Sequence, residues 1–347
     1  MELFVPGRIC LFGEHSDWAG GYRRDYPEIE KGYTLISGTN QGLYARVSTS
    51  PSLILRSTLP DGSVRTVELA MDDATLLKEA QSGAYWSYIA GVAYQIRQRH
   101  PHVGGVTIDN YKTTLPVQKG LSSSAAVSVL TARAFNQLYG LGFDIRDEME
   151  MAYLGEITTP SQCGRMDQGC AFGVRPILMT FDGDDLDVQP VSIGAPIHLI
   201  VVDLGAFKDT PKILADLNRC YPIATNPCAK GVQELLGPRN KQLIHDAMAV
   251  LQAGDAQRLG ALMREAQAAF DRYAMPACPD QLTSPVLHQL LAYEPLQPLV
   301  WGGKGVGSQG DGSAQFVAKS AEAQQQAISL IERELNMTCL PLTLGNS

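Results

Sequence analysis

The sequence predicts a mixed α/β protein with two domains, and three observations support this prediction. The chain has 347 residues, which is long for one compact core. Short β-type runs bounded by turns are interspersed with segments of helical period along the whole chain. Two glycine-rich segments, at residues 120–124 and 301–312, interrupt this pattern and are candidates for ligand-binding loops.

Composition narrows the class of protein. Hydrophobic residues make up 45% and charged residues 18%, as in globular proteins. The net charge of −8 argues against nucleic acid or an anionic membrane as partner. No apolar run approaches the roughly 20 residues of a membrane span, and no secretory signal is visible. The seven cysteines are scattered without a CxxC pair, so we expect reduced thiols in a cytoplasmic protein without a zinc site.

The elements can be taken in order. Residues 2–12 form an apolar strand that leads into a polar, glycine-rich loop at 13–21, and 22–33 is charged and aromatic, typical of an exposed loop. Runs between 34 and 70 predict hairpins. The remaining predicted elements are helices at 85–97, 125–138, 146–156, 230–252 and 255–273, the last with Asp255 as N-cap, and strands at 103–111, 197–205 and 314–320.

The segment 120–124 has the composition of an anion-binding loop. Ser122, Ser123 and Ser124 precede a helix that carries Val127, Leu130, Ala134 and Leu138 at spacings of three and four. Hydroxyls, free backbone N–H groups and the helix dipole all favour an anion there, and small side chains let a phosphate approach closely. A serine-capped core helix is the competing interpretation.

The second glycine-rich segment matches the pattern GxGxxG at residues 305–310. A dinucleotide site needs that pattern between a strand and a helix, whereas a strand-like run follows here. The Walker A pattern GxxxxGK[ST] and the protein-kinase motifs are absent from the sequence. If the protein binds phosphates, the serine loop is the better candidate.

Four segments together identify a family resemblance. They are PGRICLFGEHSDWAGG, PVQKGLSSSAAVSVL, CGRMDQGCAFG and GGKGVGSQGDGSAQFV. The first, second and fourth resemble the three motifs of the GHMP small-molecule kinase superfamily, in the same order, and the third resembles the catalytic-aspartate segment of its galactokinase branch. The helical stretch 244–291 is also similar to galactokinases.

The resemblance implies a fold and a division into domains. The superfamily has a two-domain α+β fold, with an N-terminal domain like domain 2 of ribosomal protein S5 and a C-terminal α/β-sandwich domain. We therefore expect an N-terminal domain at 1–190, a C-terminal domain at 191–347 and an active site in the cleft between them. The oligomeric state cannot be deduced from the sequence.

The resemblance also implies phosphoryl transfer from ATP with Mg²⁺. Asp167 would orient or deprotonate the attacking hydroxyl, and Arg8 would face it and keep it ionised. Ser124 and Glu156 would hold Mg²⁺, a hard cation that prefers oxygen ligands. The residues expected to bind the ATP phosphates are Lys119, Gly120, Leu121, Ser122, Ser123 and Ser124.

The expected acceptor is a small-molecule sugar, and four residues are expected to contact it. Glu14, His15 and Asp17 match the galactokinase EHTDY motif, whose acidic and histidine side chains contact sugar hydroxyls, and Gly164 lies in the catalytic segment. The sequence departs from galactokinases in two places. The segment 22–42 is longer, and the motif GGKGVGSQGDGSAQFV has more polar residues. Because of these departures, the identity of the sugar stays open. Arg23 and Arg24 could favour an acidic sugar, or simply lie on a solvated face.

Two other functions compete with a sugar kinase. Some relatives of galactokinases sense sugars with little activity, but Ser123, Ser124 and Asp167 are all present here and favour the enzyme. A mevalonate-type kinase would use the same chemistry on another alcohol. Asp17 disfavours it, because a second carboxylate would repel the carboxylate of that substrate.

Overall fold

The computed structural model describes residues 1–59, 61–115, 121–161 and 163–345. They form two compact units that alternate along the chain. Unit 1 contains Met1–Arg8 and Gly38–Val174, and unit 2 contains Ile9–Ser37 and Arg175–Ser347. Strands β1 (Glu2–Phe12) and β2 (Gly32–Ser50) each pass from one unit into the other. The sequence predicted one boundary near residue 190 between an N-terminal and a C-terminal domain. That division differs from these two units, and it stays a prediction.

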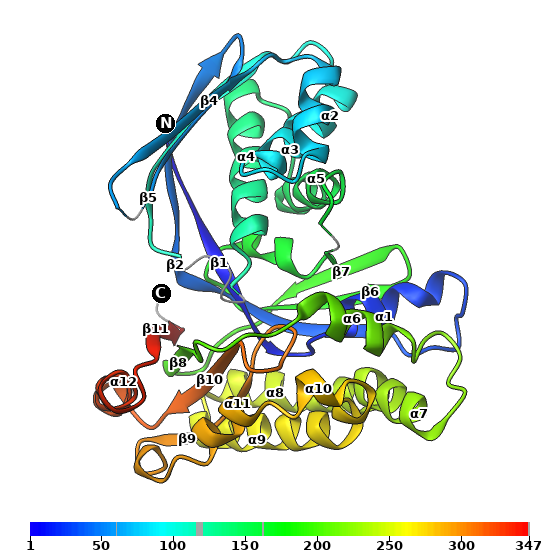
Figure 1. Ribbon diagram of the computed structural model, residues 1–347, viewed down its shortest axis with the longest axis vertical. Helices are drawn as coiled ribbons and strands as arrows, with labels where there is room; N and C mark the ends of the chain where they lie inside the picture. Colours follow the sequence, from blue (N-terminus) through cyan, green and yellow to red (C-terminus); the bar gives the residue numbers. More distant parts are fainter. Residues whose placement is uncertain (60, 116–120, 162, 346–347) are drawn as a thin grey trace. The chain divides into compact units, whose positions relative to one another are not determined.

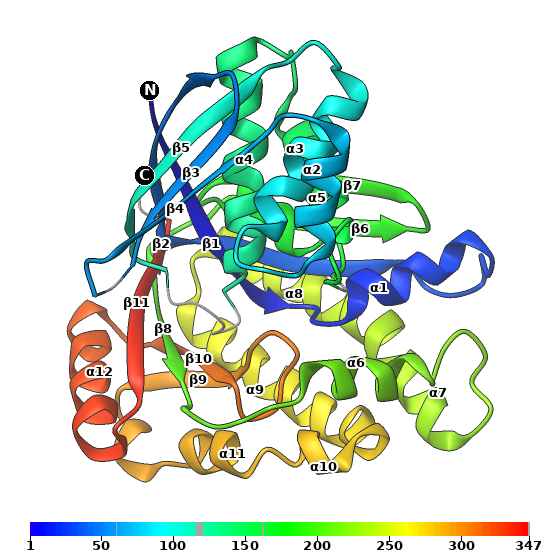
Figure 2. The ribbon, with the colours of Figure 1, turned by 45° about the horizontal axis from the view of Figure 1, so that its top comes forward.

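Unit 1 contains a sheet with helices on one side. The strand order is β4 (Val64–Leu69), β3 (Leu53–Thr58), β5 (Gly105–Thr113) and the later part of β2, and β1 pairs with β2. Strands β3 and β5 are parallel, so β3 and β4 form a hairpin as predicted but β2 and β3 do not. Figures 1 and 2 show the helices gathered on one side of this sheet: α2 (Asp73–Gln81), α3 (Ser87–Arg99), α4 (Ser123–Tyr139) and α5 (Ile145–Ile157).

Helix α4 is buried around most of its circumference. Of the four residues predicted to face the core, Leu130 and Ala134 are buried, whereas Val127 and Leu138 are only half-buried. Helices α3 and α5, strand β5 and the 3₁₀ segment η2 (Asp167–Phe172) all contact α4, so small residues on several of its faces are covered. The buried surface of α4 is therefore wider than the single apolar stripe that the sequence predicted.

Unit 2 is built on a four-stranded antiparallel sheet in the order β11–β8–β10–β9, together with a hairpin that pairs with the start of β2. The strands are β6 (Ile177–Asp182), β7 (Asp185–Pro190), β8 (Ile197–Asp203), β9 (Val300–Gly305), β10 (Ser313–Ala318) and β11 (Thr338–Leu344). The helices are α1 (Ser16–Gly21), α6 (Thr210–Asn218), α7 (Pro227–Glu234), α8 (Asn240–Ala253), α9 (Ala256–Tyr273), α10 (Pro279–Leu282), α11 (Pro285–Leu291) and α12 (Ala321–Leu335).

Helix α9 confirms its prediction, and the helix predicted at 230–252 is divided. The Asp255 carboxylate accepts a hydrogen bond from the backbone N–H of Arg258 at 2.9 Å, which caps α9. The other helix is interrupted at Gly237 and Pro238, where Gly237 has non-helical backbone angles and proline lacks an N–H donor. The interruption separates α7 from α8.

The second glycine-rich segment is part strand. Its first residues form β9, which pairs with β10 so that Lys304 lies opposite Gln315. The glycines allow close packing against α9, since a Cβ on Gly260 of α9 would lie 2.6 Å from Trp301. The prediction of a loop throughout 301–312 is therefore wrong for its first half. Among the described residues, no helix is long and apolar enough to cross a membrane.

Candidate functional site

Arg8 and Asp167 form an ion pair inside unit 1. Arg8 lies on β1 and is 4% exposed, and Asp167 begins the 3₁₀ segment η2. The Nε atom of Arg8 donates to Oδ1 of Asp167 at 3.1 Å, and Nη2 of Arg8 contacts the same oxygen. The pairing that the resemblance implied is present in the structure. It leaves Asp167 a partly accessible carboxylate beside a fixed positive charge.

A second carboxylate lies close to this pair. Glu156 lies in the last turn of helix α5 and is almost fully buried, and its Oε2 accepts from Nε2 of Gln168 at 2.8 Å. Burial raises the pKa of Glu156 to about 7, the negative charge of Asp167 adds to the shift, and hydrogen bonds from Ser124 and Gln168 oppose it. The close approach of α3 and α5 sets this position, because Gly91 packs directly on Gly155.

The oxygen atoms here suit a hard cation. The buried Oε1 of Gln168 has no hydrogen-bond partner in the structure, which is unusual for an amide oxygen. It accompanies a hydroxyl from Ser124 and carboxylates from Glu156 and Asp167, all oxygen donors of the kind Mg²⁺ prefers. Within the described ranges, no group of three or more His, Cys, Asp or Glu side chains could hold a metal, so a bound ion would keep water or phosphate ligands.

The serine loop leads directly into helix α4. Ser122 has a left-handed backbone (φ 54°) and its side chain does not cap the helix, so it does not occupy the N-terminal N–H groups. The carbonyl of buried Leu121 accepts from the N–H of Arg8 at 3.1 Å, which ties the loop to β1. Lys119 and Gly120, two of the predicted phosphate-binding residues, lie outside the described residues.

Glu14, His15 and Asp17 are all buried at the start of α1 in unit 2, whereas Gly164 is half-buried in unit 1. The Glu14 carboxylate forms an ion pair with Lys304. Nε1 of Trp18 donates to Nδ1 of His15 at 3.3 Å, so the neutral ring carries its proton on Nε2, 3.2 Å from the carbonyl oxygen of Ser308.

His15 is held as a neutral imidazole. Burial lowers its pKa to about 4, the charge of Lys208 adds to the shift, and the hydrogen bond to Ser308 opposes it. Both ring nitrogens already have protein partners. A ligand would therefore meet the ring itself or displace one of these hydrogen bonds.

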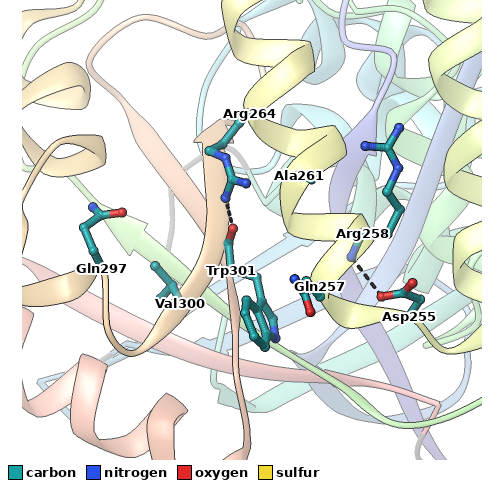
Figure 3. Close-up of a pocket in the computed structure, with 8 residues that line it drawn as sticks. All are labelled: Asp255, Gln257, Arg258, Ala261, Arg264, Gln297, Val300 and Trp301. Carbon is teal, nitrogen blue, oxygen red and sulfur yellow. Dashed lines mark hydrogen bonds between the residues drawn. The ribbon is translucent and has the colours of Figure 1, made fainter.

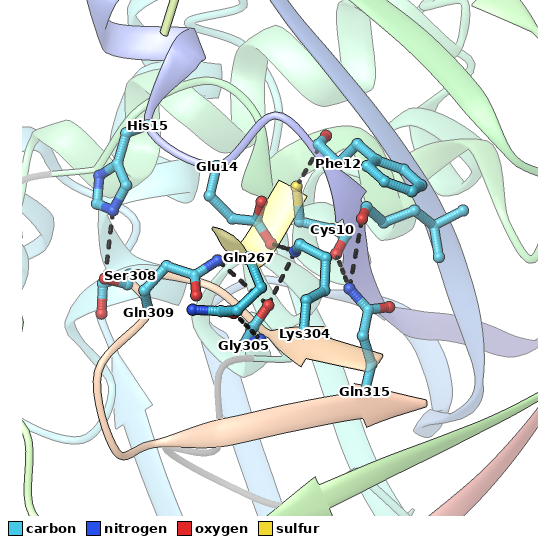
Figure 4. Close-up of polar contacts among 11 residues, drawn as sticks. Cys10, Phe12, Glu14, His15, Gln267, Lys304, Gly305, Ser308, Gln309 and Gln315 are labelled. Carbon is cyan, nitrogen blue, oxygen red and sulfur yellow. Dashed lines mark hydrogen bonds and ion pairs between the residues drawn. The ribbon is translucent and has the colours of Figure 1, made fainter. Parts of the chain in front are cut away.

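The structure adds Lys304, Gln267 and Gln309 to the surroundings of Glu14, as Figure 4 shows. Lys304 and Gln309 were visible in sequence only as polar departures within a glycine-rich motif. Gln267 gave no signal, because one glutamine on a long amphipathic helix is ordinarily a surface residue. Arg23 and Arg24 form ion pairs with Asp182 and Asp184 respectively, so their charges are matched within the protein.

A surface pocket of about 520 Å³ lies elsewhere in unit 2, between α9 and β9 (Figure 3). Its polar groups serve local structure: Asp255 caps α9, and the guanidinium of Arg264 donates to the carbonyl of Trp301. Its lining contains none of the residues predicted as functional.

Comparison with known proteins places part of the chain in a family. A model of the GHMP kinases N terminal domain matches residues 87–174, which include α3, α4, α5 and Asp167. This segment is therefore similar to the N-terminal domain of GHMP kinases, whose members use ATP. The chain is 26% identical over 315 residues to a galactokinase of Streptomyces coelicolor, a match that covers 80% of this chain and 75% of that protein.

The fold agrees with this assignment. The structure matches Lactococcus lactis galactokinase in complex with galactose (TM-score 0.71, 16% identity, 100% of this chain and 94% of that one). It also matches Methanococcus jannaschii mevalonate kinase (TM-score 0.74, 13% identity, 100% and 98% of the two chains). At these identities the matches establish the two-sheet α+β GHMP kinase fold, and the substrate has to be argued from residues.

Proposed function

We propose that this GHMP kinase transfers the γ-phosphoryl group of ATP to a hydroxyl of a monosaccharide, by analogy the anomeric one. The observation that carries the proposal is the Arg8–Asp167 pair, with Glu156 and Ser124 beside it at the start of α4. The similarity to a galactokinase over most of the chain favours a sugar as the acceptor. A sugar kinase needs an oriented carboxylate of this kind close to a phosphate-binding helix terminus.

In the proposed reaction, a sugar oxygen forms a bond to the γ-phosphorus while the bond from that phosphorus to the β–γ bridging oxygen breaks. ADP leaves with the electron pair of the broken bond. Asp167 orients the sugar hydroxyl and accepts its proton, which then passes to solvent. Arg8 holds the Asp167 carboxylate in place and offsets negative charge in the transition state.

ATP would bind at the loop that precedes α4. Backbone N–H groups at Leu121–Ser124 and the helix dipole would bind the phosphates, with Lys119 and Gly120 completing the loop. Ser124 and Glu156 would hold Mg²⁺, and the unpartnered Gln168 oxygen supports a cation there. A cation held there would offset the negative charge of the transferring phosphates.

The sugar would contact Glu14, His15 and Asp17, together with Gly164 from the catalytic segment. The buried carboxylates of Glu14, just before α1, and of Asp17, within α1, are suited to accept hydrogen bonds from sugar hydroxyls. A mevalonate-type kinase remains the second candidate, because the fold matches a mevalonate kinase as well as a galactokinase. The sequence similarity to a galactokinase favours a sugar kinase over a mevalonate-type kinase.

The test is ADP release from ATP and Mg²⁺ across galactose, other hexoses, pentoses, uronic acids and mevalonate. We expect turnover with one class of sugar, and the phosphorylated position follows from ³¹P NMR of the product. Turnover with mevalonate would keep the family chemistry and overturn the sugar proposal. ATP and sugar binding without ADP release would indicate a sensor.

A further inference from the structure

Lys304 is a buried lysine on strand β9, in a segment otherwise rich in glycine. Its side chain is 2% exposed and is among the largest fully buried side chains of the protein. Lysine is almost never fully buried unless it is paired, because removing an ammonium from water is costly. Such a residue in a glycine-rich motif therefore needs a physical reason.

The reason is a set of contacts within unit 2 (Figure 4). The Nζ atom forms an ion pair with Oε1 of Glu14 and donates to the carbonyl of Gly305 at 2.8 Å. The N–H of Gly305 donates to Oε1 of Gln267 at 2.7 Å, and Nε2 of Gln309 donates to the Gly305 carbonyl at 3.2 Å. Residues from β9, α9 and the β9–β10 connection thus fix the ammonium in one position.

The pair uses only one of the two oxygens of Glu14. Oε1 is bound to Lys304, and among the described residues the structure shows no hydrogen-bond partner for Oε2. Glu14 therefore presents Oε2 as the oxygen that the described part of the protein leaves without a partner.

We propose that Lys304 is a positioning residue, which holds Oε1 of Glu14 so that Oε2 is the oxygen presented to the substrate. This inference rests on the proposed sugar-kinase function. A carboxylate oxygen that already accepts from an ammonium is a poorer acceptor for a further donor, so Oε2 is the main acceptor that Glu14 offers. The sugar accordingly meets Glu14 through Oε2.

The neighbouring elements carry other groups that titrate or are charged. Cys10, His15 and Asp17 lie on the same segment of chain as Glu14, Lys208 lies near His15, and Asp271 lies behind Gln267 on α9 beside His288. His15 is neutral because it is buried between Trp18 and Ser308. Lys304 is the positive group that contacts the Glu14 carboxylate.

The first test is a double-mutant cycle on KM for the sugar. Without Lys304 the Glu14 carboxylate loses its fixed orientation, so Lys304→Met should raise KM for the sugar by about tenfold and leave KM for ATP unchanged. In a Glu14→Gln background, Lys304→Met should raise KM for the sugar no further. The control is Lys319→Met, an exposed lysine after β10 that should keep the wild-type KM.

A second test keeps Lys304 in place, in case Lys304→Met does not fold. KM is measured for the wild type and Glu14→Gln with a series of monodeoxy sugars. We expect the effect of Glu14→Gln to disappear for the deoxy sugars that lack a hydroxyl bound by Oε2. Its persistence with every deoxy sugar, or additive effects of Lys304→Met and Glu14→Gln on KM, would overturn the inference alone. Absence of ADP release from the wild type with every sugar would overturn the proposed function and the inference with it.

Discussion

At the residue scale, the Arg8–Asp167 pair combines fixed geometry with partial access. Two nitrogens of the guanidinium contact one oxygen of Asp167, so the carboxylate is oriented as well as neutralised. Lysine offers a single ammonium and cannot reproduce this arrangement. The guanidinium geometry, in addition to its charge, should therefore matter for turnover.

We predict that Arg8→Lys lowers kcat by about a hundredfold, equivalent to roughly 3 kcal/mol of transition-state stabilisation. KM for the sugar should change much less, because Arg8 acts through Asp167. The control is Arg46→Lys, an exposed arginine that pairs with Glu2, which should leave kcat unchanged. Steady-state kinetics measures both, and an unchanged kcat in Arg8→Lys would remove Arg8 from the catalytic role.

His15 makes stability depend on pH. An unfolded histidine binds a proton near pH 6.5, whereas the pKa of folded His15 is about 4. The stabilisation is therefore fully present above about pH 6.5 and is lost as pH falls towards 4. Between pH 7.5 and pH 5, the wild type should lose about 2 kcal/mol more unfolding free energy than His15→Gln.

Urea denaturation at the two pH values measures this difference. The control is His102→Gln, which alters an exposed histidine and should behave as the wild type does. Equal losses in the wild type and His15→Gln would show that His15 is not held neutral by burial.

These residues also show what sequence can predict at this scale. The Arg8–Asp167 pair followed from the family resemblance, because both residues lie in recognisable motifs. The Lys304–Glu14 pair joins positions 290 residues apart, and a lysine is ordinarily expected on the surface. Only the three-dimensional arrangement shows that one neutralises the other.

At the element scale, small residues decide how closely the helices approach. In unit 1, a Cβ on Gly91 of α3 would lie 2.2 Å from the carbonyl oxygen of Gly155 on α5. Glu156 follows Gly155 directly, so this contact helps to set the position of the proposed metal ligand. We predict that Gly91→Ala destabilises the protein by about 1–2 kcal/mol, although alanine alone favours a helix.

The measurement is urea unfolding, with Gly21→Ala as control. A Cβ on Gly21, the last residue of α1, would meet nothing within 4 Å. We expect that variant to be neutral or slightly more stable than the wild type. A Gly91→Ala protein as stable as the wild type would contradict the proposed tight contact between α3 and α5.

Elements with a strong local signal were predicted well. Helix α9 has an N-cap and a clear apolar face, and both are present in the structure. The prediction for α4 underestimated its burial, because periodicity describes one face and cannot show that α3, α5 and β5 cover the others. The glycines of β9 suggested a loop, but here they serve packing against α9 and pairing with β10.

At the scale of the whole molecule, the α+β GHMP kinase fold was predicted correctly from the motifs and their order. The alternation of the two compact units was not, because β1 and β2 each continue from one unit into the other without a break in pattern. Boundaries are predicted from linkers and shifts in composition, and these two crossings have neither.

The central claim is that Asp167 carries phosphoryl transfer to a sugar. The most direct measurement is ADP release by Asp167→Asn with the preferred sugar, alongside binding of a non-hydrolysable ATP analogue and of the sugar. The control is Asp185→Asn, which alters an exposed aspartate on β7 and should retain full turnover. We predict that Asp167→Asn loses at least about a thousandfold in kcat, equivalent to roughly 4 kcal/mol, while it still folds and binds both ligands. Near-normal turnover in Asp167→Asn would contradict the account.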